Sequence, residues 1–139
     1  MTSPLENLAK AGKLKAEPPD RKEFEGLARS GKLKLADAQK AELSYESRFD
    51  LAYNAAHALA LAALRRAGYR SENRYLVFQC LAHTVNMPAE RWRVLSLAHE
   101  RRNIAEYAGA LDRDERLLKD MLGVTEQLLA ILTKLGPPK

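Results

Sequence analysis

Apolar side chains recur at every third or fourth position along most of this chain. Between residues 20 and 42 they form one face, which is made of Phe24, Leu27, Ala28, Leu35 and Ala38. This spacing is the period of an α-helix, and Asp20 followed by Glu23 adds a capping box at its start. Gly31 falls on the same face. A glycine there marks either a close approach of a neighbouring backbone or a weak point in the helix, and both interpretations stay open.

Residues 44–66 predict a second helix that is buried on most sides. Ser44 or Ser47 is its expected N-cap, and Gly68 ends it after two arginines. Apolar residues cover most of its circumference, which is typical of a central helix. Its polar exceptions are spaced three, four and three residues apart and therefore share one stripe: Ser47, Asp50, Asn54 and His57.

Three more helices are predicted in the second half of the chain. Ser71 caps the segment NRYLVFQCLAHTV, residues 73–85, and Pro88 suits the first turn of a helix that runs to about Gly109. Asp112 with Glu115 forms a capping box for a last helix, which ends near Gly136. Four or five helices on short connections predict an all-α, up-and-down helical bundle over residues 20–139.

Residues 1–19 are predicted to form a short N-terminal arm. Leu5 and Leu8 line one side of a short helix that Gly12 ends. Pro18 and Pro19 then separate this arm from the bundle, because proline cannot continue a helix. We expect the arm to pack on the bundle or on a partner.

The composition is that of a globular domain, with 46% hydrophobic and 29% charged residues. A single cysteine excludes an internal disulfide and a cysteine-based metal cluster. The longest uncharged run, residues 51–64, is too short to span a bilayer, and the N-terminus lacks the apolar core of a signal peptide. The sequence therefore predicts a cytoplasmic protein with no membrane partner.

The net charge of +5 is concentrated in the middle of the chain. Residues 65–102 contain eight arginines, no lysine and three acidic residues, which sum to +5, so the rest of the chain balances to zero. Arginine offers a planar fork suited to phosphate or carboxylate. The excess indicates either an anionic partner or ordinary solvated helix faces.

The stretch HERRNIAEY, residues 99–107, places five polar side chains on one helical face, with Arg101 beside them. Such a face is a candidate anion site or a polar dimer seam, and the alternative is a solvated stripe held by local ion pairs such as Arg102 with Glu106. The five are His99, Arg102, Asn103, Glu106 and Tyr107. The inner surface of the same helix is expected to consist of Leu95, Ala98, Ile104, Ala105 and Ala108.

Two segments, RFDLAYNAAHALALAALRRAGY at 48–69 and RNIAEY at 102–107, resemble the HEPN superfamily of small helical bundles. The resemblance covers roughly residues 20–135 and implies a homodimer, often paired with a nucleotidyltransferase in toxin–antitoxin or defence systems. In the ribonuclease members, an arginine, a polar residue and a histidine meet across the dimer and cleave RNA without metal. By position, Arg102 would hold the scissile phosphate and Asn103 would orient it.

Tyr107 stands where the family motif has histidine. A phenol has a pKa near 10, so only about one in a thousand is ionised at neutral pH, which makes it a poor general base. Some family toxins carry a modified tyrosine two residues further on, where this chain has Gly109. His99 is a possible substitute, and His57 is either a second candidate or a core residue. No two histidines have metal-ligand spacing, so neither a zinc site nor a cofactor is expected.

Three functional hypotheses follow. The first is a homodimeric binding module for nucleotide, RNA or a partner protein, with weak or no catalysis. The second is a metal-independent endoribonuclease that uses Arg102 and Asn103 with His99 or Tyr107. The third is a purely structural interaction module. If the polar stripes of 44–66 and 88–109 face each other, Asn54 and His57 join Arg102 and Asn103 in one pocket.

Overall fold

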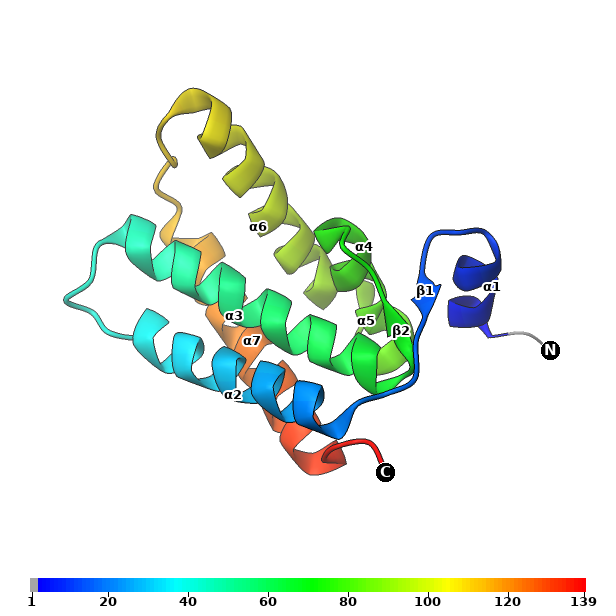
Figure 1. Ribbon diagram of the computed structural model, residues 1–139. Helices are drawn as coiled ribbons and strands as arrows, with labels where there is room; N and C mark the ends of the chain where they lie inside the picture. The colour runs from blue at the N-terminus through cyan, green and yellow to red at the C-terminus, as the bar shows by residue number, and fades with distance from the viewer. Residues whose placement is uncertain (1–2) are drawn as a thin grey trace.

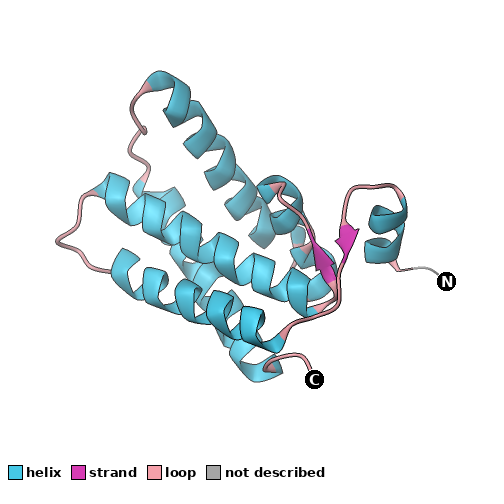
Figure 2. Ribbon diagram, viewed as in Figure 1, coloured by secondary structure: helices cyan, strands magenta, loops and turns pink. Residues whose placement is uncertain are grey.

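The structure, a computed structural model, describes residues 3–139 and confirms the predicted all-α fold (Figures 1 and 2). None of its helices is both long and apolar enough to cross a bilayer in the described part of the chain. The helices are α1 (Pro4–Lys10), α2 (Arg21–Ala38), α3 (Tyr45–Arg66), α4 (Arg74–Gln79), α5 (Leu81–Thr84), α6 (Ala89–Ala108) and α7 (Glu115–Leu135). Two short strands, β1 (Lys15–Ala16) and β2 (Tyr69–Arg70), complete the fold.

Helix α3 is the central element, as its apolar circumference predicts. Helix α2 runs antiparallel beside it, α7 crosses behind both, and α6 lies on the other side with α4 (Figure 1). Gly31 explains the close packing of α2 on α3, because a Cβ atom there would lie 2.5 Å from Cδ2 of Leu59 and 3.3 Å from the carbonyl oxygen of Ala55. Of the two interpretations of Gly31, the close approach is therefore the correct one.

Side-chain caps begin the first two long helices. Oδ1 of Asp20 accepts hydrogen bonds from the backbone N–H groups of Lys22 and Glu23, which confirms the predicted N-cap of α2. The same helix ends at Ala38, earlier than the predicted residue 42. Ser44, rather than Ser47, caps α3, because its Oγ accepts the N–H of Ser47.

The caps of α4 and α7 differ from those predicted. Asn73 caps α4 by accepting the N–H of Leu76, and Asp114 caps α7 by accepting the N–H of Leu117. Ser71 and Asp112 were the predicted caps, but each lies two residues too early for its side chain to reach the first turn. Helix α6 follows Pro88 and ends at Gly109, whose φ of 77° is left-handed, as expected.

The N-terminal arm packs on the bundle through α1 and through a strand pair that the sequence does not predict. Leu5 and Leu14 are buried in the core. In the antiparallel pair, Lys15 lies opposite Arg70 and Ala16 opposite Tyr69 (Figure 2). Two residues per strand are too few for any periodicity to show in the sequence. The first two residues of the arm lie outside the described part of the chain.

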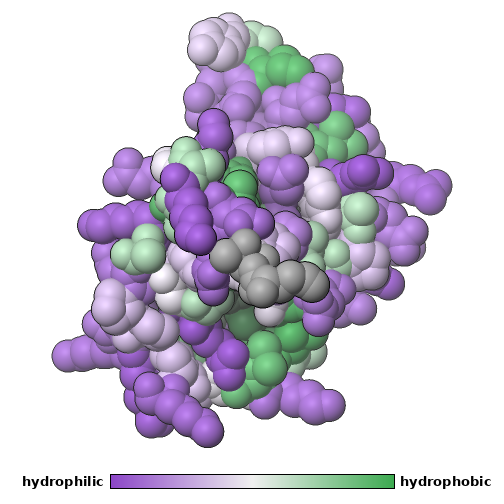
Figure 3. Space-filling view, turned by 90° about the vertical axis from the view of Figure 1, so that its right-hand side faces the viewer, coloured by the Kyte–Doolittle hydropathy of each residue, from purple (hydrophilic) through white to green (hydrophobic). Residues whose placement is uncertain are grey.

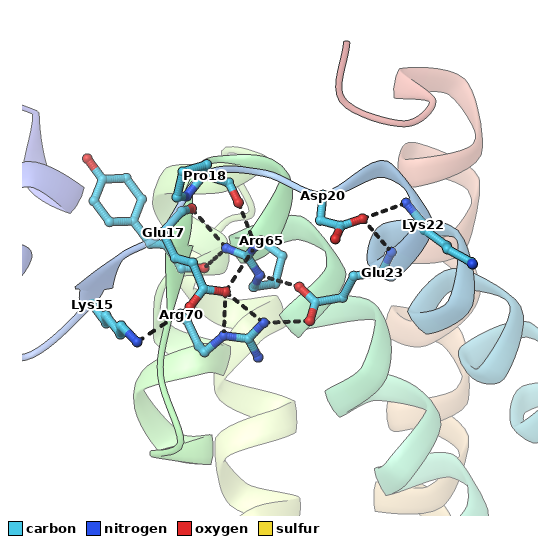
Figure 4. A network of polar contacts seen from close by, with 9 residues as sticks. Lys15, Glu17, Pro18, Asp20, Lys22, Glu23, Arg65 and Arg70 are labelled. Atoms are coloured by element: carbon cyan, nitrogen blue, oxygen red, sulfur yellow. Dashed lines mark hydrogen bonds and ion pairs between the residues drawn. The ribbon is translucent and has the colours of Figure 1, made fainter.

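A buried arginine ties the end of the arm to α2 and α3 (Figure 4). The side chain of Arg65 is 1% exposed, and it donates hydrogen bonds to the carboxylate of Glu23 and, over 2.8 Å, to the carbonyl oxygen of Pro18. Arg70 pairs with both Glu17 and Glu23. The hydrogen bond from Arg70 lowers the pKa of Glu17, and the hydrogen bond from Arg65 lowers the pKa of Glu23. These ion pairs hold the arm in place.

Candidate binding site on the α3–α6 face

The polar stripes of α3 and α6 meet at Arg102. Its Nε donates to Oδ1 of Asp50 over 3.2 Å, and its Nη1 donates to Oε1 of Glu106 over 3.3 Å. The guanidinium also lies 4.8 Å from the ring centroid of Tyr53, a cation–π contact. Two carboxylates thus neutralise Arg102 within one chain, so a phosphate would have to displace them.

His99 lies at the centre of a short hydrogen-bonded chain. The hydroxyl of Tyr53 is 2.7 Å from its Nδ1, and Nδ2 of Asn103 is 3.2 Å from its Nε2. Burial lowers the pKa of His99, and the positive charges of Arg74 and Arg102 lower it further. The imidazole is therefore neutral at pH 7, but both of its nitrogens are already engaged.

Arg102, Asn103 and Tyr107 do not converge within one subunit. Arg102 lines a cleft of about 270 Å³ with Asp50 and Glu106, whereas Asn103 lines a separate groove of about 690 Å³. The side chain of Tyr107 is 94% exposed. The residue in the histidine position is thus in contact with solvent rather than with the other two.

The remaining predicted residues of α3 lie near this face but do not join one pocket. Oδ1 of Asn54 accepts a hydrogen bond from Nη1 of Arg74 over 3.2 Å. The ring of His57 packs edge-on against Phe78, and burial lowers its pKa to about 4, with smaller effects from Arg74 and His99. Ser47 is exposed at the start of the helix. The stripes of α3 and α6 therefore meet at Asp50 and Arg102, while His57 is half-buried and neutral.

Arg101 has a structural contact instead of a place in the groove. Its Nη1 lies 3.4 Å from Oδ2 of Asp114, the N-cap of α7. This ion pair links the end of α6 to the start of the last helix across the turn that connects them.

An exposed apolar strip follows the outer face of α6. Leu97 is 39% exposed and Ile104 is 56% exposed, and both line the 690 Å³ groove with Tyr75 of α4. The prediction that Ile104 and Ala108 belong to the inner surface is wrong, because both are exposed. The C-terminal end of α6 extends beyond the other helices, and hydrophobic atoms show on the surface at this end (Figures 1 and 3).

Two important residues of this face were not predicted from the sequence. Tyr53 lies within an alanine-rich run and gave no signal, since its partner His99 lies 46 residues away on another helix. Arg74 belongs to the arginine excess, which did not single it out. Within residues 3–139, neither Arg74 nor Arg93 has a carboxylate within 4.0 Å. They are the cations of this face that remain after Arg101 has paired with Asp114 and Arg102 with Asp50 and Glu106.

Comparison with protein-family models, with curated proteins and with solved structures finds no match for this chain. Within residues 3–139, no group of three or more histidine, cysteine, aspartate or glutamate side chains is arranged to hold a metal ion. The α3–α6 face is therefore interpreted from its own geometry: a polar stripe and an apolar strip on α6, with two arginines that no carboxylate neutralises, Arg74 of α4 and Arg93 of α6.

Proposed function

We propose that this chain is a HEPN-like binding module that acts as a homodimer through α6 and does not cleave RNA. The observation that carries the proposal is the exposed strip of Leu97 and Ile104 on a helix that extends beyond the bundle. Large apolar side chains exposed along one helix face are typical of a protein–protein interface. A nucleotidyltransferase partner and a cytoplasmic location belong to the same proposal.

The order of residues along α6 suits a two-fold interface. Leu97 and Ile104 are seven residues apart, which is two helical turns, and Glu100 and Arg101 lie midway between them. In an antiparallel pair of α6 helices, Leu97 of one copy packs against Ile104 of the other. Glu100 of each copy then lies near Arg101 of the other. A two-fold interface needs such a self-complementary surface.

The molecular mass in solution tests the dimer. We expect wild-type protein at micromolar concentration to have twice the 15.6 kDa mass of one chain by light scattering. The double substitution Leu97→Glu with Ile104→Glu should give a monomer, because it places carboxylates in the interface. Leu33→Glu is a matched control, since Leu33 is an exposed leucine on α2. A wild-type monomer, or a dimer that survives the double substitution, would contradict the proposal.

Single-stranded RNA or a nucleotide is the ligand that the charges of this face favour. Arg93 lines the groove with Tyr75, whose ring is exposed, and Arg74 precedes Tyr75 at the start of α4. Among residues 3–139 neither arginine has a carboxylate within 4.0 Å. Cations for phosphates together with an aromatic ring for bases is the usual combination in proteins that bind single strands. Leu97, Glu100 and Ile104 line the same groove and are covered in the proposed dimer, so the RNA is expected at the end of the groove beside Arg93 and Tyr75.

Fluorescence anisotropy with labelled single-stranded RNA in EDTA tests this ligand. We expect the affinity to fall steeply as salt rises, because phosphate contacts release counterions. Arg74→Ala with Arg93→Ala should weaken binding by roughly tenfold or more, and Arg21→Ala, an exposed arginine of α2, should not change it. If RNA does not bind at low salt, the RNA ligand is wrong, and the protein is an interaction module without a nucleic-acid ligand.

The geometry argues against the alternative of a metal-independent ribonuclease. Tyr107 is fully exposed, Arg102 is neutralised, and both nitrogens of His99 are engaged. We therefore expect single-stranded RNA to stay intact with wild-type protein in EDTA. Cleavage that disappears in Arg102→Ala would support the ribonuclease instead, and Tyr107→His should then increase it.

A further inference from the structure

A long groove follows the flank of α7, and none of its lining residues belongs to α6. One part, of about 370 Å³, lies beside Leu118, Leu122 and Gly123. The other part, of about 670 Å³, lies between α7 and α2. Glu126 lines both parts, so the two lie end to end along the helix.

The groove has an apolar floor and the length of a helix. Leu122 and Leu129 are half-buried and lie seven residues apart on α7, and Leu35 and Ala36 of α2 form the opposite wall. From Glu115 to Lys134 the helix rises by about 28 Å. A groove of this kind accommodates an amphipathic helix of about five turns with its apolar face inward.

The charges at the rim of the groove are predominantly positive. Four cationic side chains line it and have no carboxylate within 4.0 Å among residues 3–139: Lys32, Arg48, Lys119 and Lys134. Both groove carboxylates are already engaged, since Glu115 pairs with Arg113 and Glu126 accepts a hydrogen bond from the amide of Gln39. The groove therefore complements a partner with acidic flanks.

Gly123 leaves part of the groove wall without a side chain. It lies exposed in the middle of α7, and a Cβ atom there would meet nothing within 4 Å. Glycine is among the least favourable residues in a helix interior. Gly31 of α2 is explained by its contact with Leu59, whereas no contact inside the described chain explains Gly26 or Gly123, and of these two only Gly123 lines the groove. A position without a side chain on the groove lets another backbone approach closely.

We propose that the α2–α7 groove binds an amphipathic helix of another protein, with leucine-like side chains on one face and acidic residues on both flanks. The apolar floor supplies most of the contact area, and the four cations select the acidic flanks. Gly123 marks the point of closest approach. This proposal does not depend on the function proposed for α6.

Two synthetic helical peptides of about 20 residues test the proposal with the 139-residue chain. Both carry the same leucine face, and one has glutamate flanks while the other has lysine flanks. We expect the acidic peptide to bind with an affinity that falls as salt rises, and the basic peptide to bind at least tenfold more weakly. Equal binding of the two peptides, or no binding of the acidic one, would overturn the proposal.

Substitutions in the groove give the second measurement. The double substitution Lys32→Glu with Lys134→Glu should lower the affinity for the acidic peptide at least tenfold. Gly123→Gln should raise the midpoint of thermal unfolding, because glutamine has a higher helix propensity than glycine. The same substitution should lower the affinity for the acidic peptide. Gly26→Gln is the matched control, since Gly26 is also exposed in a helix interior but lies outside the groove, so only the midpoint should rise. Unchanged peptide affinity in Gly123→Gln would overturn the role of that position.

The α6 variant separates this proposal from the proposed function. Leu97→Glu with Ile104→Glu should abolish the dimer and leave the binding of the acidic peptide unchanged. Loss of peptide binding in that variant would place the peptide on α6 and overturn the groove assignment.

Discussion

His57 and His99 lie on α3 and α6, and burial lowers the pKa of both imidazoles. Two arginines, Arg74 and Arg102, lower the pKa of His99 further. Neither histidine therefore carries a positive charge at neutral pH. An anion bound at this face therefore depends on guanidinium groups, and within residues 3–139 neither Arg74 nor Arg93 has a carboxylate within 4.0 Å.

The shifted pKa of His57 predicts a dependence of stability on pH. The imidazole titrates near 6.5 in the unfolded chain and at about 4 in the folded chain. The contribution of neutral His57 to the free energy of unfolding is therefore complete above pH 6.5. It is lost as the pH falls toward 4, and the loss is at most about 3 kcal/mol. Urea unfolding of wild type and His57→Gln across this range measures the loss, which should be smaller in the variant. Parallel curves for the two proteins would contradict the assignment.

The contact between α2 and α3 depends on the absence of a side chain at Gly31. Gly31→Ala should destabilise the protein by about 1–3 kcal/mol, because the new methyl group overlaps Leu59, which is fully buried. Gly26→Ala on the same helix should instead stabilise it by up to about 1 kcal/mol, since nothing lies within 4 Å of the new Cβ. Thermal unfolding compares the two, and a stabilising effect at position 31 would show that α2 can shift away from α3.

The elements that the sequence predicts are those long enough to repeat their period several times. Helices α2, α3, α6 and α7 show that repeat and are confirmed, whereas β1 and β2 are too short to show any. The short helix of the arm is confirmed as well, because Leu5 and Leu8 and the glycine after it suffice to predict it. The cap of α7 was misplaced because two aspartates, Asp112 and Asp114, compete, and only the backbone path decides between them.

The candidate site was predicted only in part, for a similar reason. Periodicity placed Asp50 and Arg102 on stripes that do meet. It could not reveal the contact of Tyr53 with His99, which depends on how α3 and α6 pack. It also assigned Ile104 to the inner surface, because sequence alone does not show that α6 extends past its neighbours.

In the whole molecule, the ion pairs around Arg65 join four separate segments. They link the arm at Glu17, α2 at Glu23, α3 at Arg65 itself and β2 at Arg70 (Figure 4). The pKa values of Glu17 and Glu23 are lowered, so the contribution of these ion pairs to the free energy of unfolding is complete above pH 4.5. It is lost as the pH falls below that value.

Removal of the Arg65 guanidinium should destabilise the whole fold. We expect Arg65→Met to cost about 3 kcal/mol, because it leaves Glu23 and three backbone carbonyls without their buried partner. Arg21→Ala, which breaks the exposed pair with Glu25, should cost less than about 1 kcal/mol. Urea unfolding followed by the fluorescence of Trp92, the single tryptophan, measures both. Equal losses in the two variants would mean that the network contributes no more than a surface pair.

The pairing of β1 with β2 also has a consequence during synthesis. Lys15 and Arg70 are 55 residues apart (70 − 15), so at ribosomal speed the first strand waits roughly 3–11 seconds before its partner is made. Throughout that interval Leu5 and Leu14 have no bundle to cover them. The arm is therefore made before the bundle and yet is one of the last parts of the fold to be buried.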